Sequence, residues 1–90
     1  MTSQKFVLNS SYGLRTKEIT IVVQCALVFQ CEIFLEANQR RVDLKSIMGV
    51  ASLGIANQAQ IQIFADGADE KQAIKELEKE LLNLQFTNTI

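Results

Sequence analysis

The chain contains no histidine and no proline among its 90 residues. Without histidine, the protein cannot use an imidazole as a general base, a zinc or haem ligand, a pH switch or a phosphoryl acceptor. No proline-rich, repeated or low-complexity stretch interrupts the chain, so we expect one domain spanning residues 1–90. The missing histidine thus excludes several kinds of site before any fold is considered.

Cysteine is scarce, since Cys25 and Cys31 are the only two in the chain. Two thiols without histidine cannot supply the four ligands of a structural zinc site. Their apolar surroundings and the lack of a secretion signal predict reduced, buried thiols. The sequence therefore implies neither a metal ion nor a cofactor.

Long apolar runs and an excess of positive charge are also missing. Residues 1–11 lack the apolar segment of a signal peptide, and no run approaches the roughly 18 apolar residues of a membrane span. Nine Lys and Arg against ten Asp and Glu give a formal charge of −1, which offers no electrostatic basis for direct nucleic-acid binding. We expect a cytoplasmic protein with neither a membrane nor a nucleic-acid partner.

The first part of the chain combines a strand pattern with a helix pattern. Residues 5–8 predict a short strand, and a polar turn follows at residues 9–13. The β-branched residues of segment 16–30 favour a strand, whereas the spacing of its apolar residues favours a helix. We predict a helix there, with Thr16 as its cap and Glu18 in its first turn.

The middle of the chain predicts a hairpin and a short helix. Residues 32–36 and 41–44 alternate between apolar and polar side chains, and a turn at 37–39 separates them. Residues 46–54 begin with Ser46 as a candidate N-cap and end on a glycine, which predicts a helix of about two turns.

The last part predicts a strand and a long helix. Residues 60–65 alternate most clearly of all segments. From Asp69, a capping box with Gln72 leads into an amphipathic helix. The apolar stripe of this helix comprises Ala73, Ile74, Leu77, Leu81 and Leu84.

The order of these elements is βαββαβα. Each element offers a single apolar face, and packing the helices on one side of one sheet buries all of these faces. The predicted fold is therefore of the α+β class, an open-faced β-sandwich whose four-stranded antiparallel sheet is covered on one face by helices.

Two runs of residues carry a family resemblance. Residues 42–54 read VDLKSIMGVASLG, and residues 65–70 read ADGADE. With Phe6, Gly13 and the strand at 32–36, these runs resemble the HPr family, the small phosphocarrier proteins of the bacterial sugar phosphotransferase system. The resemblance covers nearly the whole chain and implies an HPr-like fold for it.

The chain differs from that family at the phosphoryl-accepting site. Residues 13–19 read GLRTKEI, where the family has G-[IL]-H-A-R-P-A with a phosphoryl-accepting histidine. Arg15 occupies the histidine position, and a protonated guanidinium has no lone pair with which to accept a phosphoryl group. The resemblance therefore implies a histidine-lacking, Crh-like member that has no catalytic residue and is not an enzyme.

Two residues near Arg15 also differ from the family pattern in ways that disfavour the binding of a phosphoryl group. Glu18 places a carboxylate in the first helical turn, where it would compete with or repel a phosphoryl group. Lys17 stands at the family's arginine and keeps the charge but loses bidentate phosphate geometry. The alternative interpretation is that Arg15 and Glu18 form only a solvated surface pair.

Ser46 matches the regulatory serine of the family. In Gram-positive HPr proteins and in Crh, this serine is phosphorylated by HPr kinase/phosphorylase. The modified protein then acts as a corepressor with the catabolite control protein, a LacI-type transcription factor. The alternative is that Ser46 only caps its helix, which is worth about 1 kcal/mol.

An exposed surface next to Ser46 is the candidate partner-binding site. Helical spacing directs Val50 and Leu53 toward the core and leaves the other apolar residues of the short helix toward solvent. The candidate partner-binding residues are Arg15, Lys17, Ile47, Met48 and Ala51.

Three functions follow from the resemblance. The first is a regulatory, catabolite-repression protein controlled through Ser46, with HPr kinase/phosphorylase and a LacI-type regulator as partners. The second is a phosphorylation-independent binding module for phosphotransferase components or a metabolic enzyme. The third is a conventional phosphocarrier, which Arg15 disfavours. The chain is expected to be a monomer or a homodimer that exchanges its first strand, with residues 9–13 as the hinge.

Overall fold

The computed structural model describes residues 1–9 and 13–88. These residues form five strands and three helices. Residues 10–12 of the turn expected at 9–13 lie outside the described residues. The elements are β1 (Thr2–Leu8), α1 (Thr16–Leu27), β2 (Glu32–Ala37), β3 (Arg40–Asp43), α2 (Ile47–Ala51), β4 (Gln60–Asp66), α3 (Glu70–Asn83) and β5 (Phe86–Asn88).

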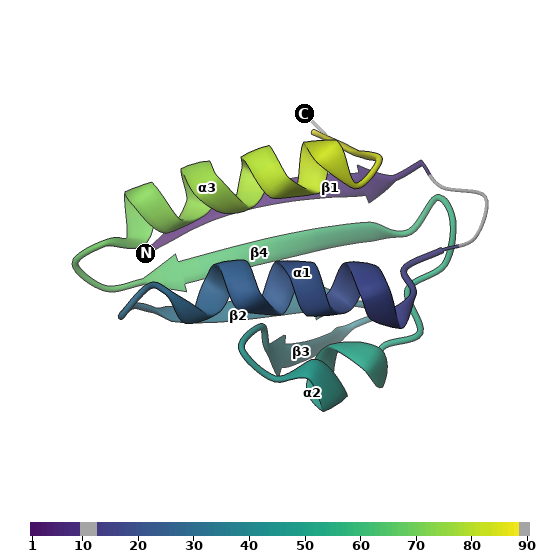
Figure 1. The fold of residues 1–90 in the computed structure, drawn as a ribbon, viewed down its shortest axis with the longest axis horizontal. Coiled ribbons are helices and arrows are strands. Elements are labelled where there is room, and N and C mark those ends of the chain that lie inside the picture. The colour runs from purple at the N-terminus through teal and green to yellow at the C-terminus, as the bar shows by residue number, and fades with distance from the viewer. Residues whose placement is uncertain (10–12, 89–90) are drawn as a thin grey trace.

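The strands form one antiparallel sheet in the order β3-β2-β4-β1-β5. Figure 1 shows α1 and α3 in front of this sheet and α2 beside its β3 edge. The predicted open-faced arrangement is confirmed, with one correction, because the sheet has five strands and not four. The additional strand β5 pairs with β1, placing Phe86 opposite Leu8. Three residues are too few for alternation to reveal a strand in the sequence.

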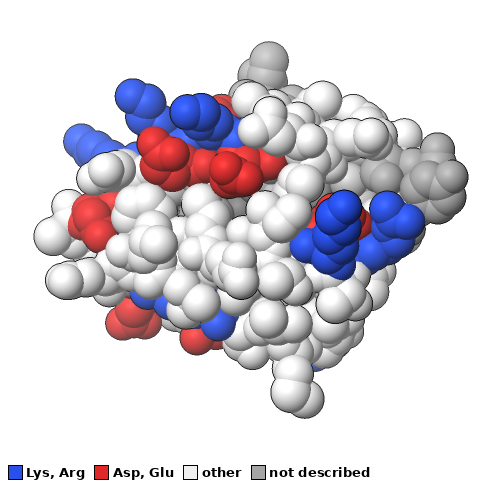
Figure 2. Space-filling model, viewed as in Figure 1, with Lys and Arg blue, Asp and Glu red and all other residues white. Residues whose placement is uncertain are grey.

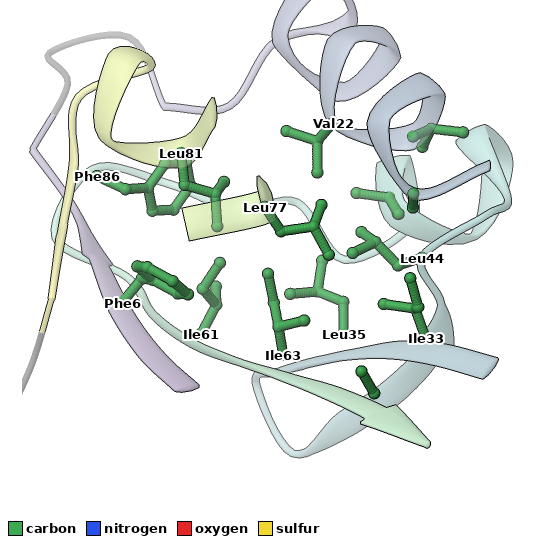
Figure 3. Close-up of a cluster of buried hydrophobic side chains, with 14 of the residues drawn as sticks. Phe6, Val22, Ile33, Leu35, Leu44, Ile61, Ile63, Leu77, Leu81 and Phe86 are labelled. Carbon is green, nitrogen blue, oxygen red and sulfur yellow. The ribbon is translucent and has the colours of Figure 1, made fainter. Parts of the chain in front are cut away.

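The core lies between the sheet and the helices that cover it. Alternate residues of the central strands point inward, so Phe6, Ile61 and Ile63 meet Leu77 and Leu81 of α3 (Figure 3). Each of these side chains is at most 4% exposed. Burying a side chain of this size contributes roughly 1.5–3 kcal/mol. Within the described residues, no helix combines the length and the apolar composition that crossing a membrane requires.

Helix α1 ends at Leu27, three residues earlier than predicted. Phe29 continues the apolar spacing of the helix and is only 8% exposed, but it reaches the core from the loop that follows. Its main-chain N–H donates to the Ala26 oxygen at 3.2 Å and closes the last turn. The periodicity therefore identified a buried residue correctly and assigned it to the wrong element.

The predicted capping box between Asp69 and Gln72 is wrong. Asp69 does precede α3, but its carboxylate accepts no hydrogen bond from that helix. It accepts instead the main-chain N–H groups of Gln30, at 2.9 Å, and Cys31, at 3.0 Å. The bond from Gln30 first, then a hydrogen bond from the Cys31 thiol and the main-chain bond from Cys31, lower the pKa of the Asp69 carboxyl. Asp69 therefore fixes the loop between α1 and β2.

Both cysteines are free thiols. Cys31 is buried as predicted, whereas Cys25 is only half-buried, which corrects the expectation for that residue. Burial and the neighbouring Asp69 raise the pKa of the Cys31 thiol to about 11. Burial, followed by Glu80 and Glu76, also raises the pKa of Cys25. Both thiols therefore stay protonated at neutral pH.

The start of β1 is attached to the start of α3 through Glu70. The Glu70 carboxylate accepts a hydrogen bond from the Thr2 hydroxyl and another from the Gly67 main chain, and it lies 3.1 Å from the Met1 amine. These contacts, the Thr2 bond first, lower the pKa of Glu70 to about 2. An ionised Glu70 therefore helps to hold the first strand in place.

We predict that Glu70→Gln makes the free energy of unfolding depend less steeply on pH in the acid range. The pKa of Glu70 is about 2 in the folded chain and 4.5 in its ordinary state, so its stabilisation is complete above pH 4.5 and is lost as the pH falls toward 2. Urea unfolding measured across this range should show a shallower pH dependence for the variant than for the parent. Equal slopes for the variant and the parent would contradict the prediction.

Candidate functional site

Ser46 is the N-cap of α2, as the sequence predicts. Its backbone is extended (φ −115°, ψ 115°), and its half-buried Oγ accepts the main-chain N–H of Gly49 at 3.1 Å. Its carbonyl accepts the N–H of Val50 at 3.1 Å and begins the helix. The hydroxyl therefore satisfies an N–H group that the helix leaves without an internal partner.

The residues before Ser46 fix its position. The Asp43 carboxylate accepts the main-chain N–H of Lys45 at 2.9 Å, and the Asp43 carbonyl accepts that of Ser46 at 3.1 Å. The Lys45 ammonium donates to the Phe29 main-chain oxygen at 2.7 Å. Strand β3 and the loop after α1 thus hold the chain where it enters α2.

The other end of α2 is held by the β2–β3 hairpin. The Asn38 side-chain amide donates to the Leu53 oxygen at 3.0 Å, and the Arg40 guanidinium donates to the Ser52 oxygen at 3.1 Å. Both oxygens belong to the turn in which the helix ends, where carbonyl groups lack helical partners. Sequence reasoning missed both residues, because their partners lie more than ten positions away.

The apolar residues of α2 divide as the helical spacing predicts. Val50 within the helix and Leu53 just after it are buried, while Ile47, Met48 and Ala51 are exposed. Met48 is 84% exposed and Ile47 42%. Large apolar side chains exposed side by side are typical of protein-binding surfaces. The three residues form an apolar patch directly after Ser46.

The start of α1 carries its own anion. Arg15 is the N-cap and Thr16 the first helical residue, so the prediction of Thr16 as cap is wrong. The Glu18 Oε1 atom accepts the Arg15 main-chain N–H at 3.1 Å and lies 3.3 Å from the Arg15 Nε atom. Lys17 is exposed on the same turn. Arg15 and Glu18 are therefore an ion pair that also closes the beginning of the helix.

Glu18 is ionised in this arrangement. Its side chain is 17% exposed, and this partial burial by itself raises the pKa of the carboxyl. The hydrogen bonds and the positive charge of Arg15 outweigh burial, so the pKa lies below its ordinary value. A negative charge thus stands at the helix end that would otherwise attract an external phosphoryl group.

The two candidate regions are adjacent. The N–H of Leu14 donates to the Ile55 oxygen at 3.0 Å, so the chain entering α1 lies against the chain leaving α2. Gly13 makes this approach possible, because its φ is +73° and a Cβ atom there would lie 2.9 Å from the Ile55 oxygen. Figure 2 shows basic residues gathered at the end where α1 begins, with largely uncharged surface over α1 and α2.

A sheet covered on one face by helices, with a capped short helix beside the start of a longer one, is the architecture of a small phosphocarrier. A family model described as the PTS HPr component phosphorylation site matches residues 2–83. The chain belongs to the HPr family. Proteins of this family carry phosphoryl groups and are not catalysts, which agrees with the prediction of a protein without enzyme activity.

Solved structures support the assignment. The chain is similar to the histidine-containing phosphocarrier protein of Mycoplasma (28% identity, covering 91% of this chain and 93% of that one, TM-score 0.88). It is also similar to an HPr dimer of Thermoanaerobacter tengcongensis (33%, 84% and 87%, TM-score 0.74). A third similar structure is the domain-swapped dimer of Bacillus subtilis Crh, a catabolite repression protein (30%, 86% and 88%, TM-score 0.72).

We predict that removing the Ser46 hydroxyl weakens the fold without abolishing it. Ser46→Ala should lower the free energy of unfolding by about 1 kcal/mol, because the Gly49 N–H loses its acceptor. Ser46→Asp restores an acceptor and should stay within about 0.5 kcal/mol of the parent. Urea unfolding at pH 7 measures both, and an alanine variant as stable as the parent would contradict the capping role.

Proposed function

We propose that the chain is a regulatory member of the HPr family whose state is set by phosphorylation of Ser46. In this proposal HPr kinase/phosphorylase transfers the γ-phosphoryl group of ATP to the Ser46 Oγ, which releases its proton, and ADP leaves. The modified protein then acts as a catabolite-repression cofactor of a LacI-type transcription regulator. A cytoplasmic location follows from these partners.

The observation that carries this proposal is the placement of Ser46. Its half-buried Oγ caps α2 next to exposed Ile47 and Met48. Phosphorylation would add about −1.5 to −2 charges and three acceptor oxygens beside the apolar patch. A charge of that size changes the electrostatic character of the surface that a partner contacts. The buried core around Val50 remains unaltered.

The residues at the start of α1 favour a regulatory function over that of a phosphocarrier. Arg15 has no nucleophilic nitrogen, and the ionised Glu18 already occupies the first turn. We propose that Arg15 and Lys17 serve instead as the basic part of the partner-binding surface, beside Ile47, Met48 and Ala51. An anionic or phosphorylated partner surface would be recognised there by charge.

A second candidate function is binding that does not depend on phosphorylation. It is favoured by the exposure of Met48 and Ile47 in the unmodified chain. Its partners would be phosphotransferase components or a metabolic enzyme. Capture of the same partners by the parent and by Ser46→Ala would support this candidate, whereas loss of partners in the alanine variant supports the first.

The chain is proposed to exist as a monomer or as a homodimer formed by exchange of β1. Similar structures include an HPr dimer and a swapped Crh dimer. Light scattering at increasing concentration distinguishes the two states, because only a dimer shows twice the mass of the chain.

We predict that HPr kinase/phosphorylase and ATP add one phosphoryl group to the chain. Intact-mass analysis should show this single addition for the parent and none for Ser46→Ala. Ser52→Ala is a matched control that keeps Ser46 and should be modified like the parent. An unmodified parent, or an alanine variant modified equally, would contradict the proposal.

We also predict that the chain takes no label from phosphoenolpyruvate and enzyme I. The reason is that Arg15 offers no lone pair to the phosphoryl group. A histidine-bearing HPr in the same reaction is the positive control. Labelling of this chain at the rate of that control would show a conventional phosphocarrier.

A further inference from the structure

Lys45 connects the residue before the proposed phosphorylation site to the loop between α1 and β2. Its ammonium nitrogen donates to the Phe29 main-chain oxygen at 2.7 Å, across 16 positions of sequence. The side chain is half-buried. Ser46 and the loop at residues 28–31 are thus joined through a single intermediate side chain.

That loop is attached to the core and to two charged side chains. Phe29 inserts its ring into the core, and the Asp69 carboxylate binds the N–H groups of Gln30 and Cys31. The third attachment is the Lys45 bond to the Phe29 oxygen. Of the three, only the bond from Lys45 comes from a residue adjacent to Ser46.

Lys45 and Ser46 have different hydrogen-bond partners in the unmodified chain. The lysine ammonium donates to the Phe29 oxygen, whereas the Ser46 Oγ accepts the Gly49 main-chain N–H within α2. The Asp43 carboxylate holds the Lys45 main-chain N–H at 2.9 Å. The main chain of Lys45 is therefore fixed, while its flexible four-carbon side chain can change partner.

A phosphate on Ser46 would compete for the lysine ammonium. The phosphate would stand on the residue next to Lys45, whose ammonium now donates to the Phe29 oxygen. Rotation of the flexible lysine side chain would exchange one acceptor for the other. An anion of about −1.5 to −2 charges attracts an ammonium more strongly than a neutral carbonyl does. The Phe29 oxygen would then lose its bond to Lys45.

We propose that Lys45 is a switch residue that transmits the phosphorylation state of Ser46 to the loop at residues 28–31. On phosphorylation the ammonium leaves the Phe29 oxygen for the phosphate, and the loop is held less firmly. This inference rests on the proposed phosphorylation of Ser46. The surface that responds to phosphorylation would then include, besides α2, the side chains of Leu27 and Val28, which are 56% and 75% exposed.

The test compares amide hydrogen exchange in chains made with serine or phosphoserine at position 46 by chemical synthesis. Exchange at Gln30 and Cys31 should be about tenfold faster with phosphoserine, as expected for losing a bond made by a charged donor. Lys45→Gln should show the fast exchange in both forms. Lys45→Arg keeps a cationic donor and should retain the difference between the two forms.

A phosphorus NMR titration gives a second readout. Lys45 beside the phosphate should lower the pKa of its second ionisation, and Lys45→Gln should raise that pKa again. Lys79→Gln removes a lysine elsewhere and should leave it unchanged. Equal titration curves with and without Lys45, or unchanged loop exchange in the phosphoserine form, would overturn the inference. Synthesis bypasses the kinase, so failure of enzymatic phosphorylation would contradict the proposed function alone.

Discussion

A five-residue helix cannot hold its own shape in water, and α2 depends on bonds from outside it. The Ser46 hydroxyl satisfies its first turn, Asn38 and Arg40 bind the carbonyls at its far end, and Val50 is its one buried side chain. The hairpin of β2 and β3 therefore determines where α2 lies. The exposed patch of Ile47 and Met48 is in turn a consequence of that anchoring.

Charged side chains in this protein bind main-chain groups as much as they bind one another. Asp69 binds two N–H groups of the loop after α1, Lys45 binds a carbonyl of the same loop, and Glu18 binds the N–H of Arg15. The bonds of Asp69 and Lys45 fix the loop between α1 and β2, and the bond of Glu18 closes the beginning of α1. At α1 the result is chemical as well as structural, because the place for an external anion is taken by Glu18. In the proposed function, Glu18 and Arg15 together leave the chain with the fold of a phosphocarrier but without its phosphoryl transfer.

Most of the fold could be predicted from local patterns. Alternation identified β2, β3 and β4, and the spacing of Val50 and Leu53 identified the buried side of the short helix and the turn after it. The failures have a common physical cause. Phe29 and Asp69 have local patterns typical of helices, yet their decisive contacts are with distant parts of the chain. The Lys45 bond to Phe29 likewise depends on two segments that only the folded sheet brings together.

In the proposed function, a phosphate on Ser46 determines how tightly the surface around the apolar patch binds the transcription regulator. Calorimetric titration of a LacI-type catabolite regulator with the phosphoserine chain and with the unmodified chain measures the two affinities. The phosphoserine form should bind at least about tenfold more tightly, a difference of about 1.4 kcal/mol. Equal affinity of the two forms would contradict the claim and would leave phosphorylation-independent binding as the function of the surface.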